Sequence, residues 1–220
     1  MAPTQAICNS FKTQILQGVH NFSAISATAT VVGAGTGVYT VTLTGGANNG
    51  LTGQVVVCAG FGTGANNGTY LITASDATHI TTTNGASANS GGMGTCTIGD
   101  TFKLALYTST WTGSKTTTNY DSTNEVGASG SYSAGGGTLT SSTPVLSTDT
   151  AVCDFADISF TSATITARGA LIYNSSKVCN AAGGAAVCVL DFGSDKTSTA
   201  GTFTITFPTP DASNAIVRIA

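Results

Sequence analysis

Alternating apolar and polar residues recur through the second half of the chain and predict β-strands there. In residues 202–207, Phe203, Ile205 and Phe207 alternate with threonines, so a strand would have one apolar and one polar face. Residues 151–173 hold the densest run of strand-forming residues and are interpreted as two strands joined by a tight turn. Partner strands are predicted at residues 102–107, 186–192 and 215–219.

Residues 4–22 show the period of a helix instead. Cys8, Phe11 and Ile15 recur at spacings of three and four, and Thr4 is a residue type that caps helix N-termini. The expectation is a helix packed on the sheet, and the alternative is an arm that docks on a neighbouring subunit.

Residues 24–98 differ in character, because Asp76 is their only ionised residue at neutral pH. Asn-Gly pairs mark turns in this stretch, and short runs of β-branched residues lie between them. Five close-set strands predict a small sandwich of immunoglobulin-like type. These strands are predicted at residues 38–43, 54–58, 69–74, 79–82 and 95–98.

The change of composition at both ends of this stretch predicts two domains. Residues 1–23 and 99–220 would form a β-sandwich core, jelly-roll-like, with the single N-terminal helix. Residues 24–98 would be an inserted immunoglobulin-like domain, since insertions are tolerated in exposed loops. Within the core, residues 193–200 are predicted to be a polar loop between two strands. The fold class is therefore all-β.

Charge excludes several functions. Only 8% of residues are charged and the net charge is −3, against about 25% charged residues in an ordinary domain. No basic patch is available to neutralise phosphates, so nucleic-acid binding is not expected. No apolar run approaches the length of a membrane span, and the first residues lack the pattern of a secretory signal. No membrane association is expected.

The chain contains no recognisable reaction motif for hydrolysis, phosphate binding or zinc binding. The two histidines, His20 and His79, lack a nucleophile or carboxylate in a motif. His20 is placed at the end of the predicted helix, where a cation is favourable. Two acidic pairs are interpreted as solvated or turn-capping carboxylates, because calcium needs six to eight oxygen ligands. We predict no enzyme activity, no cofactor and no metal site. The acidic pairs are Asp154 with Asp157 and Asp191 with Asp195.

The spacing of the six cysteines contains no CxxC pair, which argues against a metal site and leaves disulfides as the alternative. A particle assembled in the cytosol and released later would allow such thiols to oxidise. Cys8, on the inner side of the predicted helix, and Cys153 are either a pair or buried free thiols.

The other four cysteines suggest two pairs. Cys179 and Cys188 flank a loop of small residues between two predicted strands, and a bridge there would close the end of a hairpin. Cys58 and Cys96 both lie in predicted strands of the insert, where a bridge could join its two sheets as in immunoglobulin-type domains.

The core residues resemble a family of small virion structural proteins of tailed bacteriophages. The matching segments include CNSFKTQILQGVHNF, GDTFKLALYTS and DFADISFTSATITARGALIYNSSK, and they cover about two thirds of the chain in one order. The insert resembles the immunoglobulin-like modules of phage surface proteins. The matching segments are residues 8–22, 99–109, 124–136, 154–177, 186–208 and 214–220.

This resemblance implies a repeating component of the outer surface of a phage particle, made in the host cytoplasm. The expected function is a capsid decoration or cement protein on the outside of the head, with the major capsid protein and copies of itself as partners. The alternative is a tail or fibre component that binds host surface glycans through the insert. The family implies no catalytic residue.

Overall fold

The computed structural model describes residues 2–22, 25–41, 51–76, 78–89, 92–141, 144–178 and 183–220. The chain divides into two compact units. Met1–Phe22 with Asp100–Ala220 form the core unit, and Ser23–Gly99 form the insert unit. Each unit has its own cluster of buried hydrophobic side chains. The predicted domain boundaries lie one residue from these limits.

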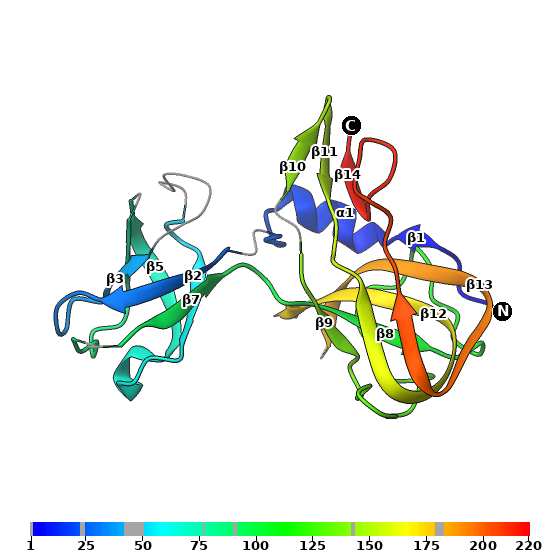
Figure 1. Cartoon of the computed structure of the whole chain (residues 1–220). Coiled ribbons are helices and arrows are strands. Elements are labelled where there is room, and N and C mark those ends of the chain that lie inside the picture. The colour runs from blue at the N-terminus through cyan, green and yellow to red at the C-terminus, as the bar shows by residue number, and fades with distance from the viewer. Residues whose placement is uncertain are drawn as a thin grey trace. The chain divides into compact units, whose positions relative to one another are not determined.

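The core unit is built on antiparallel strands, as the all-β prediction expected (Figure 1). Its main sheet has five strands, with the two long strands β12 and β13 next to each other. The order is β1 (Ala6–Ile7), β13 (Gly184–Ile205), β12 (Ile158–Val178), β8 (Phe102–Tyr107) and β9 (Gly137–Leu139).

The strands β12 and β13 correct two predictions. Residues 193–200, expected to be a polar loop, continue β13, because they pair with β12 through contacts such as Thr166 with Thr197 and Ala167 with Lys196. Threonine and serine suit a strand whose outer face meets water. Register shifts such as the one between Ala167 and Gly169 interrupt the ladder, and such bulges let both strands bend.

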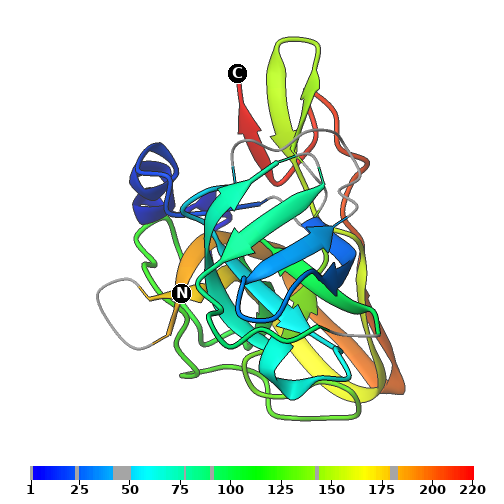
Figure 2. The same cartoon turned by 90° about the vertical axis from the view of Figure 1, so that its left-hand side faces the viewer.

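Residues 151–173 do not form the predicted hairpin. The strand β11 (Thr150–Cys153) ends before β12 begins, and the two lie in different sheets. A second sheet has the order β10 (Val145–Ser147), β11 and β14 (Val217–Ile219). The core unit is therefore all-β, with one sheet of five strands and one of three. Figure 2 shows the β10–β11 hairpin at one end of the core unit and the bend of β13 at the other.

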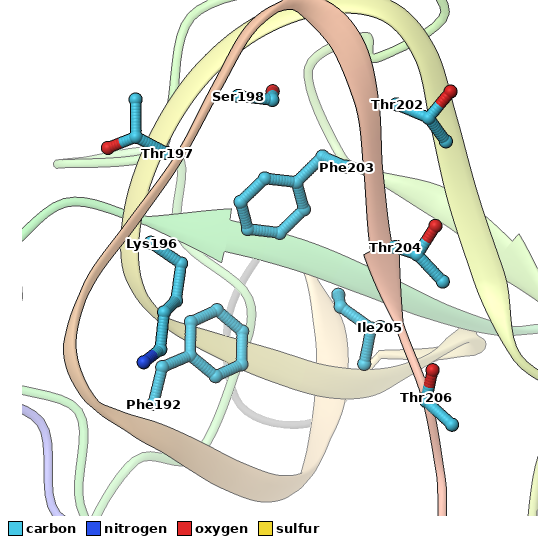
Figure 3. Close-up of a pocket in the computed structure, with 9 residues that line it drawn as sticks. All are labelled: Phe192, Lys196, Thr197, Ser198, Thr202, Phe203, Thr204, Ile205 and Thr206. Atoms are coloured by element: carbon cyan, nitrogen blue, oxygen red, sulfur yellow. The ribbon is translucent and has the colours of Figure 1, made fainter.

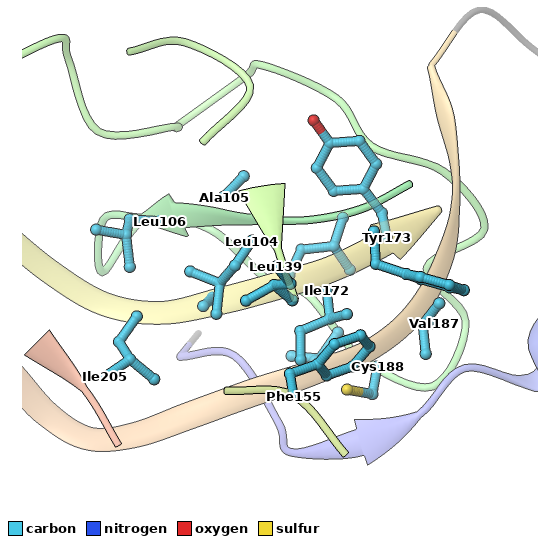
Figure 4. Packing of buried hydrophobic residues seen from close by; sticks show 14 of the residues in the cluster. Leu104, Ala105, Leu106, Leu139, Phe155, Ile172, Tyr173, Val187, Cys188 and Ile205 are labelled. Atoms are coloured by element: carbon cyan, nitrogen blue, oxygen red, sulfur yellow. The ribbon is translucent and has the colours of Figure 1, made fainter. Parts of the chain in front are cut away.

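The strand β8 is buried on both faces, although its alternation predicted a half-buried strand. Leu104 and Leu106 pack against β12 and β13, and Ala105 and Tyr107 are also inaccessible to solvent. Residues 108–136 cover the second face, with Tyr132 and Val126 joining the same cluster. Figure 4 shows this packing around Leu104 and Ile172.

The helix α1 (Asn9–Leu16) is shorter than the predicted helix. It starts late because Ala6 and Ile7 pair with Val189 and Cys188 as the edge strand β1. Thr4 therefore does not cap it, and its N-cap residue is Cys8. The helix ends soon after Leu16 because Gly18 has a φ of 68°, a conformation that terminates helices.

The insert unit is also antiparallel. Its six strands close into a barrel, instead of the two packed sheets expected for an immunoglobulin-like sandwich, because β7 pairs with both β2 and β4 and leaves no open edge. The first strand, β2, was missed by the sequence prediction, and a 3-10 turn precedes β5 at Gly64–Asn66. The order is β2 (Ile25–Val31), β3 (Val38–Val41), β6 (His79–Thr82), β5 (Gly68–Ser75), β4 (Val55–Ala59) and β7 (Gly94–Ile98).

Candidate functional sites

An apolar face of the three-stranded sheet continues from the core into solvent. Leu146, Ala151 and Ile219 are direct partners across β10, β11 and β14. On the same face, nearer the core, Cys153 pairs with Val217, and both belong to the buried cluster. Leu146 is 72% exposed and Ile219 is 56% exposed. Contiguous exposed apolar residues of this kind mark interaction surfaces. We call these three residues the apolar row.

Sequence reasoning missed this row. Its signal was a Val-Leu pair at residues 145–146 within a stretch otherwise made of serine, threonine and proline. The pair is too short for periodicity to assign a strand. The cross-strand partner of Leu146 is Ala151, and Ile219 pairs with Ala151 from the other side. Ile219 is far away in the sequence, so only the fold brings the three side chains together.

A cavity of about 490 Å³ opens where β13 bends. Phe192, Phe203 and Ile205 form its apolar floor, and Figure 3 shows their side chains directed into the space between the two arms of the strand. Lys196 lies at its rim, and its ammonium contacts only the nearby Ser194 hydroxyl, at 3.1 Å, among the described contacts. We call this space the β13 pocket. Sequence reasoning missed it because the bend was assigned to a loop.

His20 is buried in the core unit, which corrects its placement at a helix end. The side-chain amide of Asn174 donates to its Nδ1 at 3.0 Å, and its Nε2 therefore donates to Oε1 of Gln14 at 2.8 Å. Phe11 packs beside the ring, with centroids 4.8 Å apart. Burial, opposed by the nearby Asp100 carboxylate, lowers the pKa of His20 to about 4, so the ring is neutral and acts as a structural link.

The same network ties together the two points where the chain leaves and re-enters the core unit. The Asn174 amide also donates to Oδ2 of Asp100, at 2.7 Å. The backbone amide of Asn21 donates to the same oxygen at 2.8 Å, and Lys177 lies 3.3 Å from the other carboxylate oxygen. A buried carboxylate with several donors stabilises its surroundings, so we assign this cluster a structural role.

Glu125 organises the long segment between β8 and β9. Its carboxylate accepts hydrogen bonds from the hydroxyls of Tyr120 and Tyr132, at 2.5 and 2.7 Å, and from the backbone amide of Gly135 at 2.8 Å. Tyr173 donates to the carbonyl of Gly135 and stacks on Tyr120. Burial raises the pKa of the Tyr173 hydroxyl to about 12. Every group of the cluster has a partner, so it holds a loop in place and leaves no free group for chemistry.

Cys58 and Cys96 meet inside the barrel. They are direct partners across β4 and β7, both are buried, and their sulfur atoms lie 3.3 Å apart. The strands are neighbours in one closed sheet, so a bridge would link adjacent strands and not two sheets. A hydrogen bond from the Cys96 thiol lowers the pKa of Cys58, which makes Cys58 the first to ionise.

The other two predicted pairs, Cys179 with Cys188 and Cys8 with Cys153, stay predictions. Cys179 lies outside the described residues, and Cys188 is buried in the core unit, opposite Ile172 on β12 and Ile7 on β1. Cys8 and Cys153 are both buried in the core cluster. Burial raises the pKa of Cys8 to about 11, so this thiol is unreactive at neutral pH.

The acidic residues near His79 and in β12–β13 act as caps and ion-pair partners. Asp76 accepts from the backbone amides of Thr78 and His79, at 2.8 and 2.9 Å, in the turn before β6. Asp191 lies 3.3 Å from Arg168. Among the described residues, no three histidine, cysteine or acidic side chains are grouped as a metal site would require.

Asp154 and Asp157 serve different parts of the core unit. Asp154 is buried, accepts from the amide of Phe155, and has a pKa raised by burial. Asp157 accepts from the amide of Phe207, at 2.9 Å. Asp195, the last of the predicted acidic residues, is exposed. Asp154 and Asp157 thus accept hydrogen bonds from backbone amides, and Asp154 is buried and not the solvated carboxylate that the sequence predicted.

Within the described part of the chain, no helix has the length and apolar character needed to cross a membrane. No family model, curated protein or solved structure matches the chain.

Proposed function

We propose that this protein is a structural component of a bacteriophage particle, bound as a decoration or cement protein on the outside of the head. The observation that carries the proposal is the apolar row, since a core face that continues into solvent is suited to packing against another protein. The resemblance of the core segments to phage virion proteins supports the same function. As part of this proposal, the core unit is related to jelly-roll folds. The insert unit is related to immunoglobulin-like modules, although its sheet closes into a barrel.

The polar clusters support a structural function over catalysis. His20 and Glu125 are the best-connected titratable groups, and each is saturated by neighbouring side chains or backbone. Catalysis needs a group that can reach a substrate. The proposed partners are the major capsid protein and further copies of this chain.

A second candidate is a tail or fibre component that binds host surface glycans through the insert unit. The observation in its favour is the uncharged outer face of the barrel. Val55 and Leu71 are direct partners there, as are Val57 and Thr97, and all four side chains are exposed. Such a face suits a neutral ligand better than a charged one.

The ratio of this protein to the major capsid protein in purified particles separates the two candidates. Gel densitometry should give a ratio close to one or a simple fraction of it if the protein decorates the head. A ratio of a few copies per particle would favour the tail, and glycan-array binding by the insert unit would then be expected. Absence of the protein from particles would contradict both.

A further inference from the structure

We propose that the β10–β11 hairpin of one copy inserts into the β13 pocket of a second copy, so that the chain associates head to tail. The proposal names a partner for the apolar row, but its test needs no phage particle. The proposed function and this contact can therefore fail separately.

Both surfaces are apolar where they would meet. The hairpin presents Leu146, 72% exposed, at the outer end of the apolar row. The pocket presents the apolar floor of Phe192, Phe203 and Ile205 in a volume of about 490 Å³. Phe203 and Ile205 are buried and Phe192 is partly exposed, so a leucine seated in the pocket would bury its own apolar surface and cover the exposed part of Phe192.

The two surfaces are also complementary in charge. Asp149, in the turn of the hairpin, is exposed, and no described hydrogen bond or ion pair occupies its carboxylate. Lys196 at the pocket rim has no described ion pair. Seating Leu146 on the floor of the pocket brings an acidic turn to a basic rim. A face-to-face pairing of two apolar rows would gain nothing from Lys196.

The positions of these surfaces decide the type of assembly. Figures 1 and 2 both place the hairpin at one end of the core unit and the bend of β13 at the other. One chain therefore cannot fill its own pocket, and two copies cannot satisfy both surfaces through a single two-fold contact. Such a heterologous contact repeats until it closes a ring or extends as a filament.

Sedimentation velocity over a wide concentration range tests the contact. The full-length protein should form species larger than a dimer, and Leu146→Ser should weaken association about tenfold or more. Leu16→Ser is the matched control, because Leu16 is 88% exposed on α1 and lies outside both surfaces. A wild-type chain that stays monomeric at every concentration, or an unchanged Leu146→Ser, overturns the proposal.

A charge exchange tests the direction of the contact without disturbing the core. Asp149→Lys and Lys196→Asp should each impair association alone, since each brings like charges together. Mixing the two variants should restore it, because every hairpin then meets a pocket of opposite charge. Equal association of the separate variants and the mixture would overturn the head-to-tail arrangement.

Discussion

The backbones of Asn21 and Asp100 are hydrogen-bonded to each other although 78 residues separate them in the chain. The amide of Asp100 donates to the carbonyl of Asn21 at 2.9 Å, and the amide of Asn21 donates to the Asp100 carboxylate at 2.8 Å. The chain thus leaves the core unit and re-enters it at one point. Hydrogen bonds between two residues of the core unit hold these two segments together.

Removal of the insert unit should therefore leave a folded core. We expect a chain with residues 23–99 replaced by a short Gly-Ser linker to be soluble and to unfold cooperatively, because its closing residues stay together without the insert. Thermal unfolding followed by circular dichroism measures this, with the full chain as the control. The spectrum should remain rich in β-structure, and an aggregated or non-cooperative product would contradict the division into two units.

Acid should destabilise the core unit through His20. Its pKa is lowered from 6.5 to about 4 in the folded chain, so the unfolded chain binds more protons between these values. Its contribution is full above pH 6.5 and is lost as the pH falls toward 4. Urea unfolding at a series of pH values measures this.

The matched controls for this prediction are Gln substitutions at the two histidines. His20→Gln should flatten the dependence between pH 6.5 and 4, whereas His79→Gln, at the partly exposed start of β6, should leave it unchanged. An identical pH profile for all three proteins would rule out His20 as the cause.

Oxidation should stabilise the barrel of the insert unit by forming a disulfide bridge. A bridge between Cys58 and Cys96 closes a loop of intermediate length and should stabilise the unit by about 2–4 kcal/mol. Mass mapping of the oxidised protein should find these residues linked, and a reductant should lower the melting temperature. The Cys58→Ser, Cys96→Ser double variant should melt alike with and without reductant. Alkylation of both thiols after exposure to oxidised glutathione would contradict the pairing.

Loss of the Glu125 carboxylate should loosen the segment between β8 and β9. Glu125→Ala removes a charged acceptor from two tyrosine hydroxyls and one amide, and should cost about 2–3 kcal/mol of unfolding free energy. Glu125→Gln should cost less because one acceptor oxygen remains. Urea unfolding gives both values, with the exposed Asp195→Asn as the control. Equal stability of Glu125→Ala and wild type would mean that solvent replaces these bonds.

Local alternation was enough to predict β8, and it located most of the barrel strands. It failed where partners lie far apart in sequence. Ala6 and Ile7 were predicted to be part of a helix, but they pair with β13 as the edge strand β1. The threonine-rich part of β13 was predicted to be a loop, because the local sequence does not show that it pairs with β12. The buried role of His20 depends on Asn174, and the apolar row joins Leu146 to Ile219 only through Ala151, so the local pattern predicted neither feature.

The closed neck also determines how a mechanical load on the insert unit would enter the core unit. Tension passing beyond Asp100 reaches β8 almost at once, and β8 lies between β12 and β9. Asn21 and Asp100 lie side by side where the chain leaves and re-enters the core unit, so a load on the insert unit is shared between these two connections.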